Sequence, residues 1–391
     1  MKPLAQLPLR IPRSGIREIM DLAMLAEKEG PVIHLEVGQP DFATPAHVVE
    51  ATCRAVREGH TRYISTAGIG PLREAAARSY ERRTGVATSP NQILVTTGAM
   101  LSLATSFFAL LEPGDEVLVP DPGWPNYSTS VTLARGIPVP YALRAPRFLP
   151  NLDELQSLVT PRTKILLVCS PSNPTGQVHD EALTEALVAF ARRNDLWVVS
   201  DEIYSEIVFE NPAPSVLNFD IDGRCLVISG MSKTYAMTGY RIGFTRGPVD
   251  YINVGAKLQE PFVSCGTGFS QLAAVAALDG PQDCVAEMLA AYWRRRDIAL
   301  GVLRERGRYQ YTPGGAFYVL VDIKAAAMDS RDFAVRLLAE KRVAVAPGST
   351  FGRLGAEAVR VSIASRDEDV REGVGRICDF IDERKAGKDS I

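Results

Sequence analysis

Short runs of consecutive apolar residues recur through the middle of the chain, and segments with helical periodicity separate most of them. The apolar runs are ILVTT (93–97), EVLVP (116–120), KILLVCS (164–170), LWVVSD (196–201), CLVISG (225–230) and RIGFTRG (241–247). Residues 100–111 and 180–193 are typical of the helical segments between them. Continuously apolar strands are buried on both faces, and strands that alternate with helices form parallel sheets. The pattern therefore predicts an α/β domain with a mainly parallel sheet flanked by helices.

The C-terminal part of the chain has a different order of elements. A long helical pattern covers 283–306, and shorter strand and helix patterns follow at 316–322, 330–341, 343–347, 358–364 and 367–385. This order predicts a smaller α+β domain, against which a helical stretch near 16–29 packs. We expect an N-terminal arm and part of the small domain at 1–44, a large domain at 45–282, and the rest of the small domain at 283–391.

The composition is that of a globular protein with two domains. The chain has 391 residues, of which 46% are hydrophobic and 23% charged, and its formal net charge is -3. These values exclude disorder or a fibrous repeat as the main structure. A nearly balanced charge gives no reason to expect nucleic acid or an anionic membrane as the partner.

The cysteines and the N-terminal residues indicate a soluble cytoplasmic protein. The six cysteines include no C-x-x-C pair and the four histidines are scattered, so we expect neither a disulfide framework nor a metal site. The N-terminal sequence MKPLAQLPLRIPRSG lacks the apolar run of a secretory signal. Residues 84–111 carry no charge, but Pro90, Asn91 and Gly98 interrupt them. They therefore fit a strand, a turn and a helix better than a membrane span.

Polar or small residues follow several of the predicted strands at the point where each strand ends. These residues are Gly98, Ala99 and Met100 after the first run, Asn173 after the third, Asp201 and Tyr204 at the fourth, and Ser232 and Lys233 after the fifth. In an open parallel sheet, ligands bind outside the carboxyl ends of the strands. We therefore expect these residues to converge on a site of cofactor size.

Three charged residues at this edge need a chemical explanation. Lys233 follows a buried strand, where desolvation lowers the pKa of an amine and favours Schiff-base formation. Arg241 opens the next strand and suits a phosphate, to which the helix start after Gly98 also offers backbone N–H groups. Asp201 ends an apolar strand and needs a cationic partner, which the protonated ring nitrogen of pyridoxal phosphate would provide.

Five segments together resemble the class I aminotransferases, which are pyridoxal-phosphate enzymes of fold type I. The segments are VTTGAM (95–100), SPSNPTG (170–176), SDEIYS (200–205), GMSKTYAMTGYRIG (230–243) and AVRVSIA (358–364). The resemblance covers about residues 15–385 in the family's order and spacing. It implies a seven-stranded, mainly parallel sheet in the large domain and a small domain built from both chain ends.

The resemblance implies how the cofactor would be held. Lys233 is similar to the lysine that forms the Schiff base and shuttles the proton, and Asp201 to the partner of the ring nitrogen. Tyr204 and Asn173 resemble the groups on the phenolic oxygen of the ring. The remaining cofactor contacts would be Arg241, Gly98, Ala99, Met100 and Ser232 at the phosphate, and Trp124 on the ring face.

The resemblance also implies how the substrate would be held and that the site is shared between two subunits. Arg360 is similar to the bidentate anchor of the substrate α-carboxylate, with Asn173, Trp124 and the backbone at Gly38 beside it. Tyr63 resembles a tyrosine that reaches the phosphate of the neighbouring subunit, which implies a homodimer.

The implied activity is transfer of the amino group of an α-amino acid to a 2-oxo acid such as 2-oxoglutarate, within amino-acid metabolism. Members of the family with acidic substrates often have a lysine where this chain has Met100, so a neutral aliphatic or aromatic donor is expected. Arg13, Arg17 or Arg62 could still supply a cation for a distal carboxylate. The alternatives are an aspartate-type aminotransferase, a cysteine-conjugate β-lyase and a non-catalytic regulatory domain that binds the cofactor.

Overall fold

The larger of two sheets has seven strands in the order β2-β8-β7-β6-β5-β3-β4. The structure, a computed structural model, describes residues 2–9 and 11–386. The strands are β2 (Ile93–Thr97), β3 (Glu116–Asp121), β4 (Ile137–Ala142), β5 (Thr163–Cys169), β6 (Trp197–Asp201), β7 (Cys225–Gly230) and β8 (Ile242–Arg246). Only β8 runs antiparallel to its neighbours in this sheet. The predicted mainly parallel sheet is therefore confirmed.

Helices cover both faces of this sheet because successive strand residues point to opposite sides. On β3, Leu118 packs with one set of helices, while Val117 and Val119 pack with the other. The first set is α4 (Gly70–Thr84), α8 (Glu181–Arg193) and α11 (Gly268–Asp279). The second is α5 (Ala99–Leu110), α6 (Asn126–Leu133) and α10 (Val249–Val263). Both faces are thus buried, which explains why the strands read as continuous apolar runs.

The smaller sheet combines strands from both ends of the chain. It has four strands in the order β1-β10-β11-β9. They are β1 (Ile33–Leu35), β9 (Tyr318–Asp322), β10 (Val343–Pro347) and β11 (Ala358–Ser362). A separate apolar core joins this sheet to α2 (Gly15–Ala26), α12 (Asp283–Glu305), α13 (Ser330–Lys341) and α14 (Asp367–Ala386).

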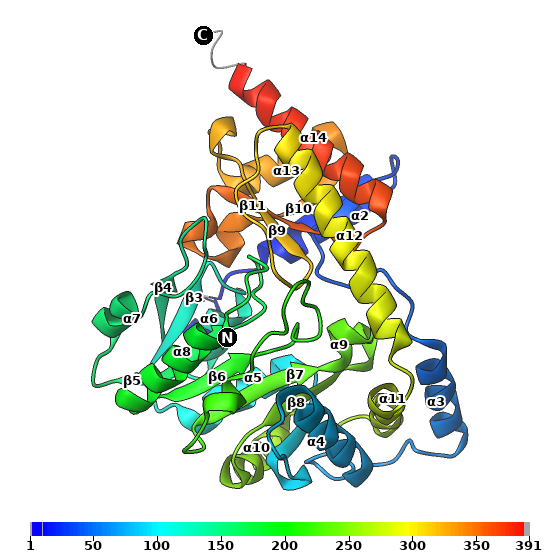
Figure 1. The fold of residues 1–391 in the computed structure, drawn as a ribbon, viewed down its shortest axis with the longest axis vertical. Coiled ribbons are helices and arrows are strands. Elements are labelled where there is room, and N and C mark those ends of the chain that lie inside the picture. The colour runs from blue at the N-terminus through cyan, green and yellow to red at the C-terminus, as the bar shows by residue number, and fades with distance from the viewer. Residues whose placement is uncertain (1, 10, 387–391) are drawn as a thin grey trace.

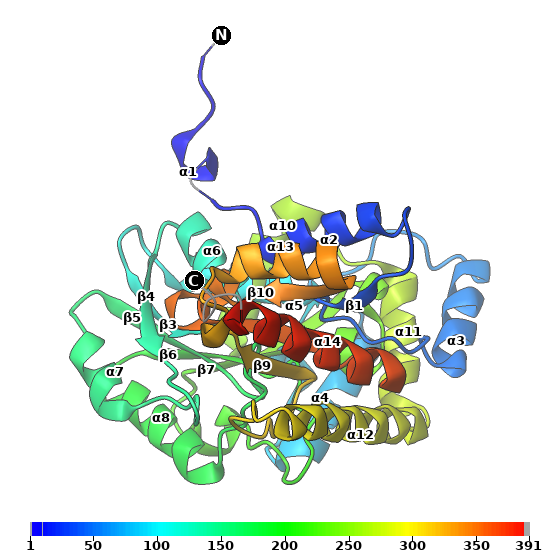
Figure 2. The same cartoon turned by 90° about the horizontal axis from the view of Figure 1, so that it is seen from above.

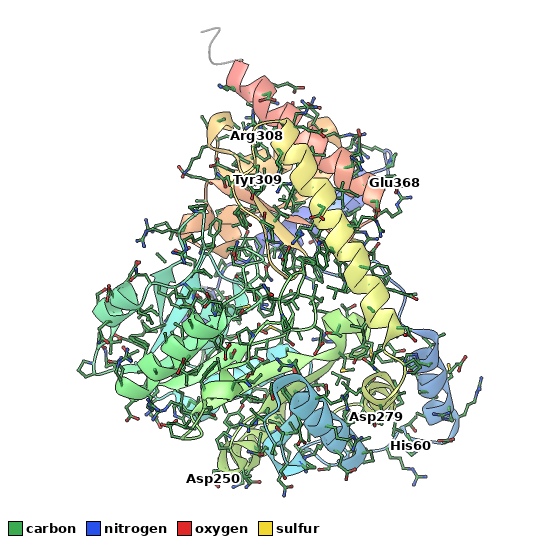
Figure 3. All side chains as sticks on the ribbon, in the orientation of Figure 1. His60, Asp250, Asp279, Arg308, Tyr309 and Glu368 are labelled. Carbon is green, nitrogen blue, oxygen red and sulfur yellow. The ribbon has the colours of Figure 1, made fainter. Side chains whose placement is uncertain are left out.

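Figure 1 shows the two sheets one above the other, with α12 running along one side past both of them. The large sheet lies below with α3 (Ala46–Arg57) and α11 at its edge, and the small sheet lies above. Figure 2 shows α1 (Gln6–Leu9) on an N-terminal arm that extends away from the rest of the chain. The remaining helices are α7 (Leu152–Leu158) and α9 (Met231–Thr234). Figure 3 shows Asp250 and Asp279 on the outside of the lower part and Arg308 and Glu368 on the outside of the upper part.

The helix and strand ends that the sequence pattern predicts lie within three residues of those in the structure. The pattern does not indicate β4, whose sequence IPVPYA carries Pro138 and Pro140. Prolines are tolerated there because β4 is an edge strand with one unpaired side. Among the described residues, no helix is both long and apolar enough to cross a bilayer. Residues 1, 10 and 387–391, which fall in the predicted first and last segments, lie outside the described residues.

Candidate active site

Lys233 lies on the short helix α9, directly after β7, and its side chain is half-buried with a desolvated amine. Its Nζ donates a hydrogen bond of 2.5 Å to the backbone oxygen of Gly38, on the segment that follows β1. Burial, and then the positive charges of Arg360 and Arg241, lower the pKa of Lys233 to about 8. An amine with a lowered pKa is a nucleophile and a base near neutral pH.

Arg241 and the start of α5 form a cradle suited to a phosphate. Gly98 precedes α5 with a φ of 76°, and no side chain caps the helix. A Cβ at Gly98 would lie 2.3 Å from Nη2 of Arg241, so only glycine lets the guanidinium approach this turn. A Cβ at Gly243 would lie 2.4 Å from the backbone nitrogen of Ala99, so β8 also packs tightly against the helix start. The first N–H groups of the helix and the guanidinium therefore face the same small volume.

Asp201 ends β6 and is held by two hydrogen bonds that the sequence does not indicate. The hydroxyl of Tyr127 donates to Oδ2 at 2.6 Å, and the N–H of Ile203 donates to Oδ1 at 3.2 Å. Burial raises the pKa of Asp201 to about 6, although both hydrogen bonds oppose the rise. The ring of Trp124 contacts the ring of Tyr127 edge to face, with 5.6 Å between centroids. A cation beside Asp201 would lower this pKa again, since an opposite charge favours the ionised carboxylate.

Arg360 lies on β11, and its buried guanidinium contacts two acceptor oxygens and two aromatic rings. Its Nη1 donates to Oδ1 of Asn173 at 3.1 Å, and its Nη2 donates to the backbone oxygen of Glu36. Its Nε is buried and has no hydrogen-bond partner among the described residues. The rings of Tyr318 and Phe351 flank the guanidinium, at 4.3 and 4.9 Å from its carbon. The guanidinium thus keeps free N–H donors for a carboxylate.

Tyr318 is the functional candidate that sequence reasoning missed. It opens β9, and its hydroxyl lies 2.7 Å from the hydroxyl of Tyr204. It therefore links Tyr204, after β6, to Arg360, on the small sheet. The segment AFYVLVD gave no signal for this role, since a tyrosine in an apolar strand is most often a core residue.

The structure brings most, but not all, of the predicted residues together within one chain. Contacts connect Lys233 to Gly38, Tyr204 to Arg360 through Tyr318, Arg360 to Asn173, and Gly98 to Arg241. Met100 accepts a contact from the side-chain amide of Asn126 at 3.5 Å, and Ser232 is partly exposed beside Lys233. Tyr63 is 88% exposed, so its side chain joins no site in its own chain. Ser229, near the end of β7, shares a hydrogen bond of 2.7 Å with the hydroxyl of Tyr80.

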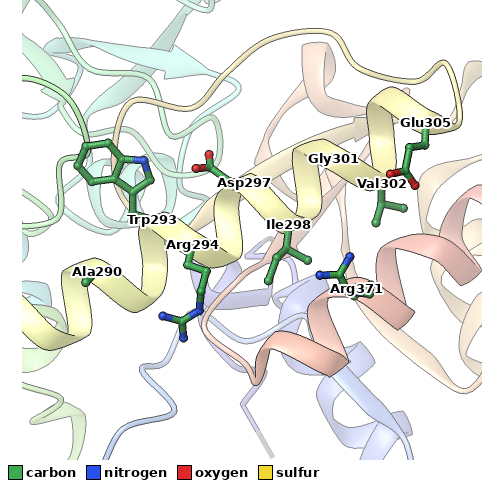
Figure 4. Close-up of a pocket in the computed structure, with 9 residues that line it drawn as sticks. All are labelled: Ala290, Trp293, Arg294, Asp297, Ile298, Gly301, Val302, Glu305 and Arg371. Atoms are coloured by element: carbon green, nitrogen blue, oxygen red, sulfur yellow. The ribbon is translucent and has the colours of Figure 1, made fainter.

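An open hollow of the surface lies away from these residues. It follows the outer side of α12 next to α14 and is lined in part by Trp293, Arg294, Asp297 and Arg371 (Figure 4). None of the predicted site residues lines it. The candidate site is therefore identified by its chemistry and not by the size of a hollow.

The residues present fit pyridoxal phosphate. A desolvated amine, a buried carboxylate and a cradle of Arg241 with a helix start suit the aldehyde, the ring nitrogen and the phosphate of that cofactor. Tyr204 and Asn173 supply a hydroxyl and an amide between these ends. Arg360 keeps one buried N–H donor without a partner among the described residues.

Comparison with known proteins shows to which family the chain belongs. The family model described as aminotransferase class I and II matches residues 30–377. The aspartate/prephenate aminotransferase of Thermus thermophilus is 39% identical over 349 residues, which cover 88% of this chain and 90% of that protein.

Two solved structures agree with this assignment. The aspartate aminotransferase from Thermus thermophilus with maleate superposes with a TM-score of 0.93 at 36% identity, covering 97% of this chain and 100% of that chain. The aromatic aminotransferase from Pyrococcus horikoshii superposes with a TM-score of 0.88 at 35% identity, covering 95% and 99%. The chain therefore belongs to the class I and II aminotransferases, fold type I enzymes that transfer amino groups with pyridoxal phosphate as their cofactor.

Proposed function

We propose that the chain transfers the amino group of a neutral aliphatic or aromatic α-amino acid to a 2-oxo acid such as 2-oxoglutarate, at the site around Lys233. The observation that carries this proposal is the desolvated amine of Lys233. Its pKa is lowered by burial and by Arg360 and Arg241, and Asp201 acts in the opposite direction. When bound, pyridoxal phosphate supplies an aldehyde that takes up the amino group and a ring that accepts electron density.

The residues of the chain then have separate tasks. Arg360 binds the α-carboxylate of the substrate, which fixes the direction of the Cα–H bond. Nζ of Lys233 would be the base that takes the proton from Cα of the substrate and holds it for the second proton transfer. Asp201, held by Tyr127, keeps a proton on the ring nitrogen. Tyr204 and Asn173 would donate to the phenolic oxygen, and Arg241 with the start of α5 would bind the phosphate. Gly98, Ala99, Met100 and Ser232 contribute to the phosphate site, and Trp124 to the ring face.

The visible spectrum of the loaded protein tests the activity. We expect a yellow band that bleaches with the donor amino acid and returns when a 2-oxo acid is added. Lys233→Ala is expected to keep the fold but to lose turnover, while Lys164→Ala, at an exposed lysine of β5, leaves both unchanged. Near-normal turnover in Lys233→Ala would contradict the assignment. A persistent band with release of ammonia and pyruvate would indicate a β-lyase instead.

The preference for a neutral donor rests on Met100, which puts a thioether where acidic-substrate relatives often have a lysine. Arg13, one of the candidate cations for a distal carboxylate, is paired with Asp21. Exchange of Met100 for lysine should raise kcat/KM for aspartate over phenylalanine by about fivefold, which corresponds to about 1 kcal/mol for one partly screened charge pair. Met100→Leu is the matched control. A wild-type preference for aspartate would instead support the aspartate-type alternative, which agrees with the name of the Thermus relative.

We propose also that two chains form a homodimer in which Tyr63 reaches the phosphate site of the partner. The exposed ring of Tyr63 and the exposed, stacked rings of Phe108 and Phe262 support an interface between chains. Sedimentation should give a dimer, and Tyr63→Ala should weaken cofactor binding by about tenfold, as expected for one lost hydrogen bond to a charged group. A fully active monomer would contradict both parts.

The domain division at 1–44, 45–282 and 283–391 stays part of the proposal. The two separate sheets and apolar cores support it. A cytoplasmic location is supported by the six cysteines, all of them free among the described residues. Limited proteolysis would test the boundaries, and cell fractionation would test the location.

A further inference from the structure

Tyr318 connects Tyr204, in the proposed cofactor site, to Arg360, in the proposed carboxylate site. It lies on β9 opposite Ser362 of β11, so Arg360, two residues before Ser362, is its diagonal neighbour on the same face. Its side chain is buried, and its ring packs edge to face with the rings of Tyr204 and Phe317. Its hydroxyl contacts Tyr204 and its ring contacts Arg360, so one side chain joins the two residues.

We propose that Tyr318 is a positioning residue, whose hydroxyl directs the proton of Tyr204 toward the cofactor and whose ring holds Arg360 in the plane that the substrate carboxylate needs. This inference rests on the proposed roles of Tyr204 and Arg360. It assigns to Tyr318 no contact with substrate or cofactor.

The direction of the proton follows from the donor count. Within the described residues, each of the two hydroxyls has the other as its only hydrogen-bond partner, at 2.7 Å. One phenol has one proton, so only one of the two can donate in this pair. When Tyr204 donates outward to a phenolic oxygen, Tyr318 must donate to Tyr204. A Cβ at Gly38 would lie 2.0 Å from the Tyr318 hydroxyl, so the backbone closes the space into which that hydroxyl could turn.

The ring has a separate task. The guanidinium carbon of Arg360 lies 4.3 Å from the Tyr318 ring centroid, and the Phe351 ring flanks it as well. Stacking on aromatic faces fixes a planar guanidinium without using its N–H donors. The titratable and charged groups that act on the Tyr318 hydroxyl are Arg360 on β11, Tyr204, Cys169 on β5 and Asp201 on β6.

Two substitutions separate these tasks in the loaded enzyme. Tyr318→Phe removes the hydroxyl and keeps the ring. A hydrogen bond to the phenolic oxygen stabilises the deprotonated form of the Schiff base between Lys233 and the cofactor. A weaker hydrogen bond therefore raises the pKa of this Schiff base. We expect the visible band to titrate about 0.5–1 pH unit higher, the size of one net hydrogen bond. kcat should fall while KM for the donor stays within about twofold, since Arg360 keeps its support.

Tyr318→Leu removes both features. It should show the same spectral shift and, in addition, an increase in donor KM of about tenfold, because Arg360 loses the ring. Tyr311→Phe is the matched control. That tyrosine is also buried and loses a similar hydrogen bond, which it accepts from the N–H of Leu320 at 2.9 Å. It should change neither the spectrum nor KM.

Tyr204→Phe distinguishes failure of this inference from failure of the proposed site. If Tyr204→Phe raises the pKa of the visible band and Tyr318→Phe leaves it unchanged, the role of Tyr318 is refuted while the site stands. If neither substitution raises it, the assignment of Tyr204 fails and the inference about Tyr318 fails with it. An equal rise in KM for Tyr318→Phe and Tyr318→Leu would refute the separate role of the ring.

Discussion

Arg83 on α4 forms a buried ion pair directly behind the lysine-bearing turn, and its removal should destabilise the fold strongly. Nη1 of Arg83 lies 2.9 Å from Oε2 of Glu202, the residue after Asp201. The two side chains are only 15% and 2% exposed. A cavity of about 50 Å³ lies beside them, lined also by Tyr80 and Ser229. The pair thus connects α4 to the end of β6 where the site begins.

The size of the effect follows from the geometry. At 2.9 Å and an effective dielectric constant of about 20, the attraction is about 6 kcal/mol before desolvation. Arg83→Met leaves the Glu202 carboxylate buried without a cation, a change that costs about 3–5 kcal/mol in buried pairs. Three hydrogen bonds stay on its other oxygen, from Ser200, Ser215 and the N–H of Val216. We therefore expect the lower end, about 3 kcal/mol.

Urea denaturation of the cofactor-saturated protein at fixed subunit concentration measures this loss. The matched control is Arg78→Met on the same helix, whose pair with Asp279 at 2.7 Å is half exposed and should cost less than about 1 kcal/mol. Adding Glu202→Gln to Arg83→Met removes the stranded charge and should recover part of the loss. Equal effects of Arg83→Met and Arg78→Met would refute the reasoning.

Three further predictions follow from the charges of the site and its surroundings. Arg360→Ala should lower kcat/KM by about a hundredfold through loss of a charge-assisted bidentate contact, with KM raised and kcat reduced; a change in thermal stability alone would make Arg360 structural. Cofactor-free protein should capture pyridoxal phosphate at a rate that rises with pH around a midpoint near 8, the pKa of Lys233, and a midpoint above 10 would show an unperturbed lysine. The hydrogen bond to Glu36, and then the one to Glu27, raises the pKa of His34 to about 9, although burial opposes the rise. A raised pKa means that the stabilisation is complete below pH 6.5 and is lost as the pH rises through 9. His34→Gln should therefore cost about 1 kcal/mol at pH 6, after allowance for solvent screening, and little at pH 10 in paired urea titrations.

The sequence predicts the positions of strands well where every residue of the strand is buried. The strands of the large sheet are apolar on both faces, so their positions can be read from composition alone. The edge strand β4 escapes this reading because Pro138 and Pro140 are typical of loops. The three-residue strand β1 escapes it because its pairing with β10 links residues more than three hundred positions apart.

By itself, the sequence determined the alternation of strands and helices, the lysine after a buried strand and the glycines that a helix start needs near a phosphate. These features can be read from residues that are close together in the sequence. They also involve residue types, such as a charged side chain after a buried strand, that would lower the stability of the fold without a function. Only the tertiary structure decided that Tyr127 bonds Asp201 and that Tyr318 bonds Tyr204, 114 residues away. In the sequence, both tyrosines look like ordinary core residues. Their rings are apolar enough to be buried, and the partner of each hydroxyl depends on which residues the fold brings next to it.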